Sequence, residues 1–372
     1  MKLKVLQIVY SGVGGTGSVA TSIIEGDKKK DFIHEILFTG VDKIFEGYKE
    51  WCNKKKINHY NHGLIKNFLV RDYKIFKIIK KIKPQIVIFH GDNYLMTIIL
   101  SIFYNFKLIY VEHNPIAYRT KKNYLLNYIT FIFFDKIIYL YNAYRTEILK
   151  KQKILNFFRK KITIIPNGVS INKNIIKIKS KKFRIGMVSR FSAGKQQMLL
   201  VHAILRLKKE HPKEKFKLEL VGNGENLYKI EKMIKDNNLE EQVTLIRSLP
   251  EHNLKKWFTR IDLYCHLSDD EGVSTAILHA LSNKTLLLVS KNQGNKFLKT
   301  NAFFTINKIS NFINKIFFIK KNINSLNKKI NNGHFFFKNK YSNEIMFKSY
   351  SKEFIRLYEK KNERNNTSRW QR

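Results

Sequence analysis

Two cations follow a predicted strand in the second half of the chain. Arg190 and Lys195 lie in the segment VSRFSAGKQ, directly after the predicted strand at residues 183–189. A guanidinium offers a fork of donors and an ammonium a point charge, so together they suit a diphosphate. In a chain with 70 Lys and Arg residues the alternative is a solvated surface pair. The position after a strand end favours the binding role.

An acidic loop leads into a second candidate phosphate site. Glu271 precedes Val273, Ser274 and Thr275, which open a predicted helix at residues 274–282. The first amides of a helix have no partner within it and favour an anion. We expect the amides of Val273 to Thr275 to bind phosphate and Glu271 to face the ligand. The alternative is that the acids only cap the helix.

Glycines and histidines follow strands in the first half of the chain. Gly14 and Gly15 lie in SGVGGTG, between a predicted strand and a predicted helix, where a backbone can approach an anion. His90 and His113 end strands, which is where parallel sheets bind ligands. The alternatives are a tight turn for the glycines and hydrogen-bonded core positions for the histidines. Gly222, in LVGNGE, ends a strand in the same way.

The composition of the 372-residue chain excludes several classes of protein. An apolar fraction of 44% is enough for a buried core. Two distant cysteines support neither a disulfide framework nor a zinc site, so a reducing compartment is expected. The apolar stretches at 96–110 and 124–141 are interrupted by charges and are too short to span a bilayer. The net charge of +41 implies an anionic partner.

Two successive series of strands and helices must position these residues. Short β-branched runs typical of buried parallel strands alternate with helical patterns, so we expect an α/β chain of two doubly wound domains. Residues 308–343 show little pattern, and the last amphipathic segment, 344–358, predicts a helix. The predicted strands lie at residues 3–10, 34–40, 85–91, 107–113, 135–141 and 162–168, then at 183–189, 216–222, 243–248, 262–267 and 284–290.

Taken in order, four motifs resemble those of the family 4 glycosyltransferases, which are retaining enzymes with the two-domain GT-B fold. The motifs are IPNGVS (165–170), VSRFSAGK (188–195), LVGNGE (220–225) and EGVSTAILHALS (271–282). The resemblance implies an N-terminal acceptor-side Rossmann-like domain (1–168), a linker (169–182) and a C-terminal domain that binds the nucleotide sugar (183–340). It also implies a central cleft, a helix at 341–361 that crosses back to the first domain, and a polar tail at 362–372.

The resemblance assigns a role to each candidate. Glu271 and His113 would contact the donor sugar at the catalytic centre. Arg190, Lys195, Gly14, Gly15, Val273, Ser274 and Thr275 would bind the donor diphosphate. Three family positions differ here, among them Lys284, which replaces a common glycine. His279 replaces a glutamate that binds the ribose, and Arg247 stands where many members have glycine near the nucleobase. His279, Arg247 and Gly222 are therefore expected at the nucleoside, although His279 has the alternative of packing between helices.

The leading interpretation is a hexosyltransferase-type enzyme that moves a sugar from a nucleotide diphosphate to a lipid-linked oligosaccharide, lipopolysaccharide or capsule precursor. We expect no cofactor and no metal, because the protein's cations replace it. The enzyme is expected in the cytoplasm, peripheral on the inner face of an anionic membrane. The alternatives are a GT-B sugar-nucleotide epimerase and a non-catalytic basic binding protein. No aromatic and basic RNA signature is present, so a nucleic-acid partner is not expected.

Overall fold

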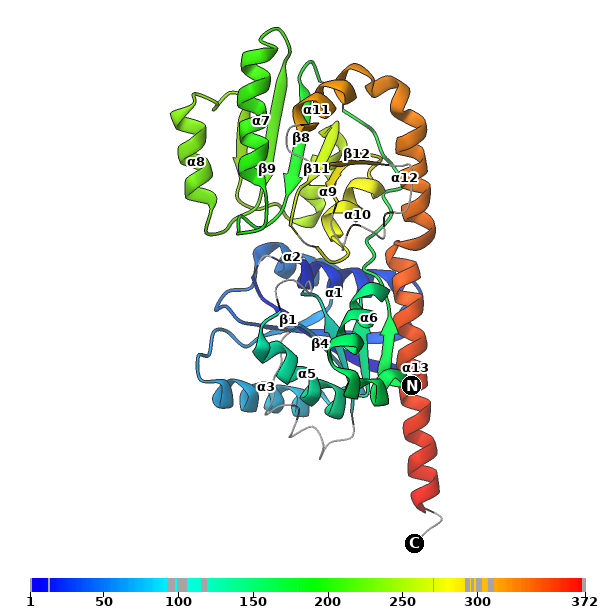
Figure 1. Ribbon diagram of the computed structural model, residues 1–372. Coiled ribbons are helices and arrows are strands. Elements are labelled where there is room, and N and C mark those ends of the chain that lie inside the picture. The colour runs from blue at the N-terminus through cyan, green and yellow to red at the C-terminus, as the bar shows by residue number, and fades with distance from the viewer. Residues whose placement is uncertain are drawn as a thin grey trace. The chain divides into compact units, whose positions relative to one another are not determined.

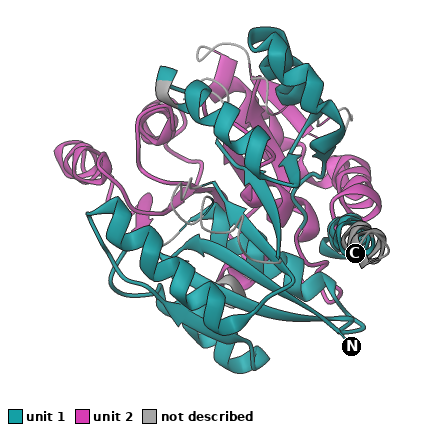
Figure 2. Ribbon diagram, turned by 90° about the horizontal axis from the view of Figure 1, so that it is seen from below, with its two compact units in different colours: residues 1–168, 343–372 teal, residues 169–342 magenta. Residues whose placement is uncertain are grey.

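The chain divides into two compact units in a computed structural model (Figures 1 and 2). Unit 1 comprises residues 1–168 and 343–372, and unit 2 comprises residues 169–342. Each unit contains its own parallel sheet. The structure describes residues 2–12, 14–91, 98, 106–114, 119–178, 180–269, 271–291, 295, 298, 303–306 and 311–369.

A seven-stranded parallel sheet forms the centre of unit 1. Its strand order is β3-β2-β1-β4-β5-β6-β7, so the order reverses between β1 and β4. Ligands of doubly wound sheets bind at the carboxyl ends of strands at such a reversal. The strands are β1 (Leu3–Tyr10), β2 (Phe32–Thr39), β3 (Asn58–Asn61), β4 (Ile86–His90), β5 (Lys107–Glu112), β6 (Lys136–Tyr139) and β7 (Ile162–Ile164).

Helices cover both faces of this sheet, as right-handed crossovers require. Apolar residues of α3, α5 and α6 share one buried cluster, and those of α1 and α2 share another. The helices of unit 1 are α1 (Gly15–Gly26), α2 (Glu46–Lys55), α3 (Phe68–Ile82), α5 (Lys121–Phe133), α6 (Asn142–Lys151), the 3-10 helix η2 (Lys153–Lys161) and α13 (Asn343–Arg369).

The C-terminal helix α13 belongs to unit 1 and packs on α1. Contact is close enough that a Cβ on Gly26 would lie 2.4 Å from the carbonyl oxygen of Asn343. The ring of Phe32 packs edge-on against Phe354 at 5.3 Å and against Phe347 at 5.8 Å. α13 continues to Arg369, beyond the segment expected from the sequence pattern.

Unit 2 repeats the architecture with six parallel strands in the order β10-β9-β8-β11-β12-β13, reversing between β8 and β11. The strands are β8 (Phe183–Val188), β9 (Phe216–Val221), β10 (Val243–Ile246), β11 (Leu263–His266), β12 (Leu286–Ser290) and β13 (Phe303–Ile306). The helices are α7 (Gln197–Glu210), α8 (Leu227–Asp236), α9 (Glu251–Arg260), α10 (Thr275–Ser282), α11 (Phe312–Lys321), the 3-10 helix η5 (Ile323–Leu326) and α12 (Asn327–Lys340).

Residues 169–182, which the sequence pattern indicates as a linker, are part of unit 2. Lys177 anchors this segment, because its ammonium donates to the carbonyls of Phe258 at 3.0 Å and Ile261 at 3.1 Å and to the hydroxyl of Thr285 at 2.8 Å. Burial lowers the pKa of Lys177 to about 8. Three acceptors therefore replace the water that a surface lysine would have.

None of the helices among the described residues combines the length and apolarity needed to cross a bilayer.

Candidate active site

The cations and the acidic loop of unit 2 meet at its strand reversal. Strands β8 and β11 pair side by side in parallel, so their carboxyl ends are neighbours. Arg190 follows β8 and Glu271 follows β11. The loop after β8 also pairs with the loop after β11, through a bridge between Lys195 and Ser268. The fold thus places Lys195 and Glu271 together, although 76 residues separate them in the sequence.

Two donors among the described residues hold Glu271. The Lys195 ammonium forms an ion pair with its Oε1, and the Nε2 of His266 donates to the same oxygen at 2.8 Å. The Nδ1 of His266 faces the hydroxyl of Tyr264 at 3.0 Å. Burial, and secondarily the charge of Lys195, lowers the pKa of His266 to about 3. His266 is therefore a neutral donor that fixes the carboxylate without neutralising it.

His266 is a site residue that sequence reasoning missed. It is only 2% exposed and is the last residue of β11. The signal was available, because a histidine at a strand end is the same feature that identified His90 and His113. No three His, Cys, Asp or Glu residues among those described gather as metal ligands would.

Arg190 has an exposed side chain that bonds none of the described residues. Its backbone is fixed, because the side-chain amide of Gln197 donates to the Arg190 carbonyl and to the Ser189 hydroxyl, both at 2.8 Å. Gly222 closes the neighbouring turn with a φ of 145°, and a Cβ there would lie 2.0 Å from the Ser189 carbonyl oxygen. Gly222 is required because the backbones of two strand ends touch.

The start of α10 follows Glu271 directly. Ser274 is its N-cap residue, and the Ser274 side chain makes no capping hydrogen bond. Val273 is buried, whereas Ser274 and Thr275 are half-buried. Backbone amides at such a helix start favour an anion, so the geometry is compatible with the phosphate role predicted for Val273 to Thr275.

Two of the three unusual positions lie in different surroundings. His279 is 2% exposed on α10, and its ring stacks on Phe258 of α9 with centroids 6.3 Å apart. Burial of this kind favours the packing alternative. Arg247 is exposed after β10, where its guanidinium lies 3.4 Å from the carboxylate of Glu231. The nucleoside roles of His279 and Arg247 stay predictions.

The glycine loop of unit 1 follows β1 at the other strand reversal. Gly14 is the N-cap of α1, and its carbonyl accepts from the hydroxyl of Tyr48 at 2.6 Å. Among the described residues, a Cβ on Gly15 would meet no atom within 4 Å, and one on Gly14 only a ring carbon of Tyr10 at 3.9 Å. In contrast, a Cβ on Gly17 would lie 2.4 Å from the Tyr48 ring. The protein itself therefore needs Gly17, and the space at Gly14 and Gly15 is open to a ligand.

The two strand-end histidines of unit 1 are in direct contact. The Nδ1 of His90 lies 2.9 Å from the Nε2 of His113, and the rings stack with centroids 5.2 Å apart. Burial lowers the pKa of His113 to about 4, and burial together with His113 lowers that of His90 further below its usual value. Both rings are therefore neutral near pH 7.

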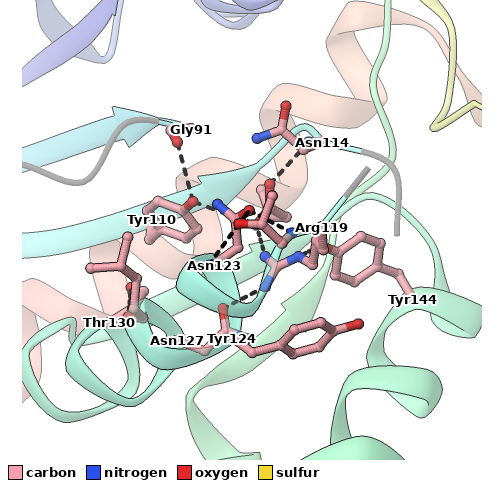
Figure 3. Close-up of polar contacts among 12 residues, drawn as sticks. Gly91, Tyr110, Asn114, Arg119, Asn123, Tyr124, Asn127, Thr130 and Tyr144 are labelled. Carbon is pink, nitrogen blue, oxygen red and sulfur yellow. Dashed lines mark hydrogen bonds and ion pairs between the residues drawn. The ribbon is translucent and has the colours of Figure 1, made fainter. Parts of the chain in front are cut away.

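A buried ion pair supports the turn that carries His113 (Figure 3). The guanidinium of Arg119 binds the carboxylate of Glu112, and both side chains are at most 4% exposed. The same guanidinium donates to Asn127 at 2.7 Å and contacts the Tyr144 hydroxyl. The other oxygen of Glu112 accepts from the backbone amide of Asn114 at 2.9 Å. This cluster fixes the backbone on both sides of His113.

Comparison with known proteins identifies the family of the chain. Residues 13–173 match the sequence profile of a family described as Glycosyltransferase Family 4, and residues 169–334 match that of Glycosyl transferases group 1. An uncharacterized glycosyltransferase of Methanocaldococcus jannaschii is 28% identical over 283 residues, which is 65% of this chain and 68% of the relative.

Two solved structures show the same fold over nearly the whole chain. Anabaena HepE in complex with UDP-glucose has a TM-score of 0.76 at 15% identity, covering 94% of this chain and 99% of the other. A glycosyltransferase from Rickettsia africae has a TM-score of 0.70 at 19% identity, covering 96% and 99%. The fold is thus GT-B, with one parallel sheet in each domain. Because the two family profiles succeed one another from residue 13 to residue 334, this chain belongs to the family 4 glycosyltransferases.

Proposed function

We propose that this glycosyltransferase moves a hexose from a nucleotide-diphosphate donor to a lipid-linked oligosaccharide, lipopolysaccharide or capsule precursor, with retention at the anomeric carbon. The observation that carries the donor side is the cluster of Lys195, Glu271 and His266 at the β8/β11 reversal. One site there combines a cation for a phosphate with a fixed carboxylate for sugar hydroxyls. The UDP-glucose bound to HepE supports a nucleotide sugar as donor.

The leaving diphosphate requires positive charge as its bond to the sugar breaks. Arg190 and Lys195 supply two cations, and the amides of Val273 to Thr275 add the positive end of α10. A bound diphosphate would share Lys195 with Glu271. These cations do the work of a metal ion in this proposal, so transfer is expected to continue in the presence of EDTA.

Retention needs little acid or base chemistry from side chains. The leaving phosphate takes the acceptor proton on the face from which it departs, and the protein supplies orientation and electrostatic stabilisation. Glu271 lies between Lys195 and the neutral His266, and its carboxylate oxygens can accept hydrogen bonds from the donor sugar. The family pattern assigns His113 to the same sugar.

The two remaining groups of predicted residues complete the donor site. Gly14 and Gly15 are proposed at the diphosphate, and Gly222 and Arg247 at the nucleoside. His279 has two candidate roles, contact with the nucleoside and packing between helices, and its burial favours packing. Gly15→Ala isolates the first role, because the added methyl group meets no atom of the described residues within 4 Å. We expect this variant to keep its thermal stability and to bind the donor more weakly.

The acceptor side of the proposal is a membrane surface. On α3, the apolar side chains of Phe68, Leu69, Val70 and Tyr73 are 43–53% exposed, among the exposed cations Lys74, Lys77, Lys80 and Lys81. Helix α5 packs on the same side of the sheet, since both helices contribute to one buried cluster (Figure 1). It exposes Leu125 and Ile132 by 66% and 55%. Apolar anchors among lysines suit an anionic bilayer.

Mass spectrometry with a panel of sugar nucleotides and a membrane lipid extract tests the function. We expect a lipid-extractable product that gains one hexose, and NMR of that product should show the anomeric configuration of the donor. An inverted product refutes retention. Conversion of the donor sugar without transfer indicates the epimerase, and salt-dependent RNA binding without turnover indicates the basic binding protein.

Sedimentation with vesicles tests the membrane surface separately. We expect binding to vesicles that contain anionic lipid, weaker binding at high salt, and weaker binding still for Lys77→Glu with Lys81→Glu. Equal binding to neutral vesicles counts against the electrostatic part. The matched control is Lys232→Glu with Lys235→Glu on α8 of unit 2, which makes the same charge change on the other unit.

A further inference from the structure

Three polar side chains form a hydrogen-bonded chain inside unit 1. Gln7 lies in β1, His90 ends β4 and His113 follows β5. Gln7 and His90 are buried, and His113 is half-buried. In the parallel register Gln7 pairs with Ile88 of β4, and His90 pairs with Val111 of β5. Side chains two residues apart on a strand lie on the same face, so His90 shares the face of Gln7 and His113 shares the face of His90. Three adjacent strands thus align the three groups.

The proton positions along this chain follow from its fixed end. The side-chain amide of Gln7 donates through Nε2 to the carbonyl of Ala20 at 3.2 Å, so its Oε1 faces the Nε2 of His90 at 3.0 Å. An amide oxygen only accepts, so the Nε2 of His90 carries a hydrogen. A neutral His90 then presents Nδ1 as an acceptor.

The same reasoning passes to His113. Its Nε2 lies 2.9 Å from the acceptor Nδ1 of His90, so Nε2 of His113 carries the hydrogen. The remaining nitrogen, Nδ1, therefore has a bare lone pair. Among the described residues it has no hydrogen-bond partner, and the half-buried ring leaves it available to a ligand.

We propose that Gln7 and His90 are positioning residues that hold His113 in the tautomer protonated at Nε2, so that Nδ1 accepts a hydrogen bond from a hydroxyl of the donor sugar. This inference rests on the proposed function for the identity of the ligand. It assigns a direction to the contact. His113 recognises an O–H group and, when neutral, offers no hydrogen to a phosphate oxygen.

The tautomer can be measured on the protein alone. Two-bond 1H–15N spectra of the full chain with 15N-labelled histidine distinguish a hydrogen on Nε2 from one on Nδ1, and His113→Asn assigns the signal. We expect the Nε2-protonated form in the natural chain. Gln7→Leu removes the fixed acceptor, so His113 should then populate both tautomers.

A conservative variant separates positioning from packing. In His90→Asn the side-chain oxygen takes the place of Nδ1 as acceptor, so the tautomer of His113 should be retained, whereas His90→Leu should lose it. Val9→Ala is the matched control, because Val9 is buried in the same strand on the same face and takes no part in the chain. It should change stability without changing the tautomer.

Turnover completes the test with the sugar nucleotide that the mass-spectrometric panel identifies. Gln7→Leu and His90→Leu should lower kcat/KM by about tenfold or more, the scale of one hydrogen bond to substrate, and His90→Asn should restore most of it. Any of three results overturns the inference. The first is a natural chain in which Nδ1 of His113 carries the hydrogen, and the second is a Gln7→Leu variant in which the tautomer of His113 is unchanged. The third is an unchanged kcat/KM in a variant that has lost the tautomer. If the tautomers are as expected but the chain transfers no sugar, the positioning role is supported and only the proposed function is refuted.

Discussion

His266 gives unit 2 a proton-linked instability that the structure lets us estimate. Its pKa is lowered to about 3 in the folded chain, mainly by burial, against about 6.5 for a histidine in an unfolded chain. Below about pH 6.5 the unfolded chain therefore binds a proton at His266 that the folded chain does not bind, so the folding stability falls as the pH falls. At pH 5, about 1.5 units below the pKa of the unfolded-chain histidine, the resulting loss of folding stability is about 2 kcal/mol.

The variant that isolates this effect is His266→Gln. The amide nitrogen of glutamine can still donate to Glu271, but it does not titrate. We expect the natural chain to lose about 2 kcal/mol more than the variant between pH 8 and pH 5. Urea unfolding followed by tryptophan fluorescence measures this. At a slope of about 2 kcal/mol per molar urea, the unfolding midpoint of the natural chain should fall by about 1 M more than that of the variant between pH 8 and pH 5.

The comparison is made within each protein, so a lower stability of the variant at pH 8 does not affect it. His202→Gln is the matched control, since His202 is exposed on α7 of the same unit. Equal losses of stability in the natural chain and in His266→Gln would show that His266 is not held neutral, and the account of how Glu271 is fixed would then fail.

Five other substitutions test the site and its supports. Replacing Arg190 or Lys195 by Ala should lower kcat by about 100-fold or more with an unchanged circular dichroism spectrum, because each cation stabilises the leaving diphosphate. Gly222→Ala should lower the free energy of unfolding by about 3 kcal/mol, measured by urea titration, because of its φ of 145° and the Ser189 oxygen 2.0 Å from the new Cβ. Arg119→Ala should lower the free energy of unfolding by about 3–5 kcal/mol in the same assay, because the buried carboxylate of Glu112 loses its ion-pair partner. His279→Gln should leave nucleoside diphosphate affinity by calorimetry within about twofold, because the ring is 2% exposed, and a clear loss would instead favour contact with the ribose.

The sequence allowed the strands that carry the site to be predicted because they are buried on both faces and read as continuous apolar runs. Strand β1 lies where its pattern indicates, at Leu3–Tyr10, and β8 at Phe183–Val188. β3 was not predicted, because its four residues, NHYN, are polar and pair only at the edge of the sheet. Helices α11 and α12 were also not predicted, since asparagine and lysine dominate residues 308–343 and obscure the apolar face.

Within the site, strand-end positions were predictable but partnerships were not. Arg190, Lys195 and Glu271 were identified from local motifs, whereas the pairing of Lys195 with Glu271 depends on two loops from different strands. The strand-end position of His266 could have been recognised, but its contact with Glu271 appears only when the acidic loop folds back onto β11. Contacts across a sheet edge depend on strand order, which local periodicity does not specify.

The packing of α13 on α1 has a consequence for how the chain is made. Unit 2 is continuous in sequence, from residue 169 to residue 342, whereas unit 1 needs residues from both sides of it. During synthesis the later unit is therefore the first whose residues are all available. Until α13 leaves the ribosome, the face of unit 1 that carries Gly26 and Phe32 has no cover from Phe347 and Phe354. A nascent chain stalled before residue 343 should therefore bind chaperones that recognise apolar surface, and completion of the last helix should release them.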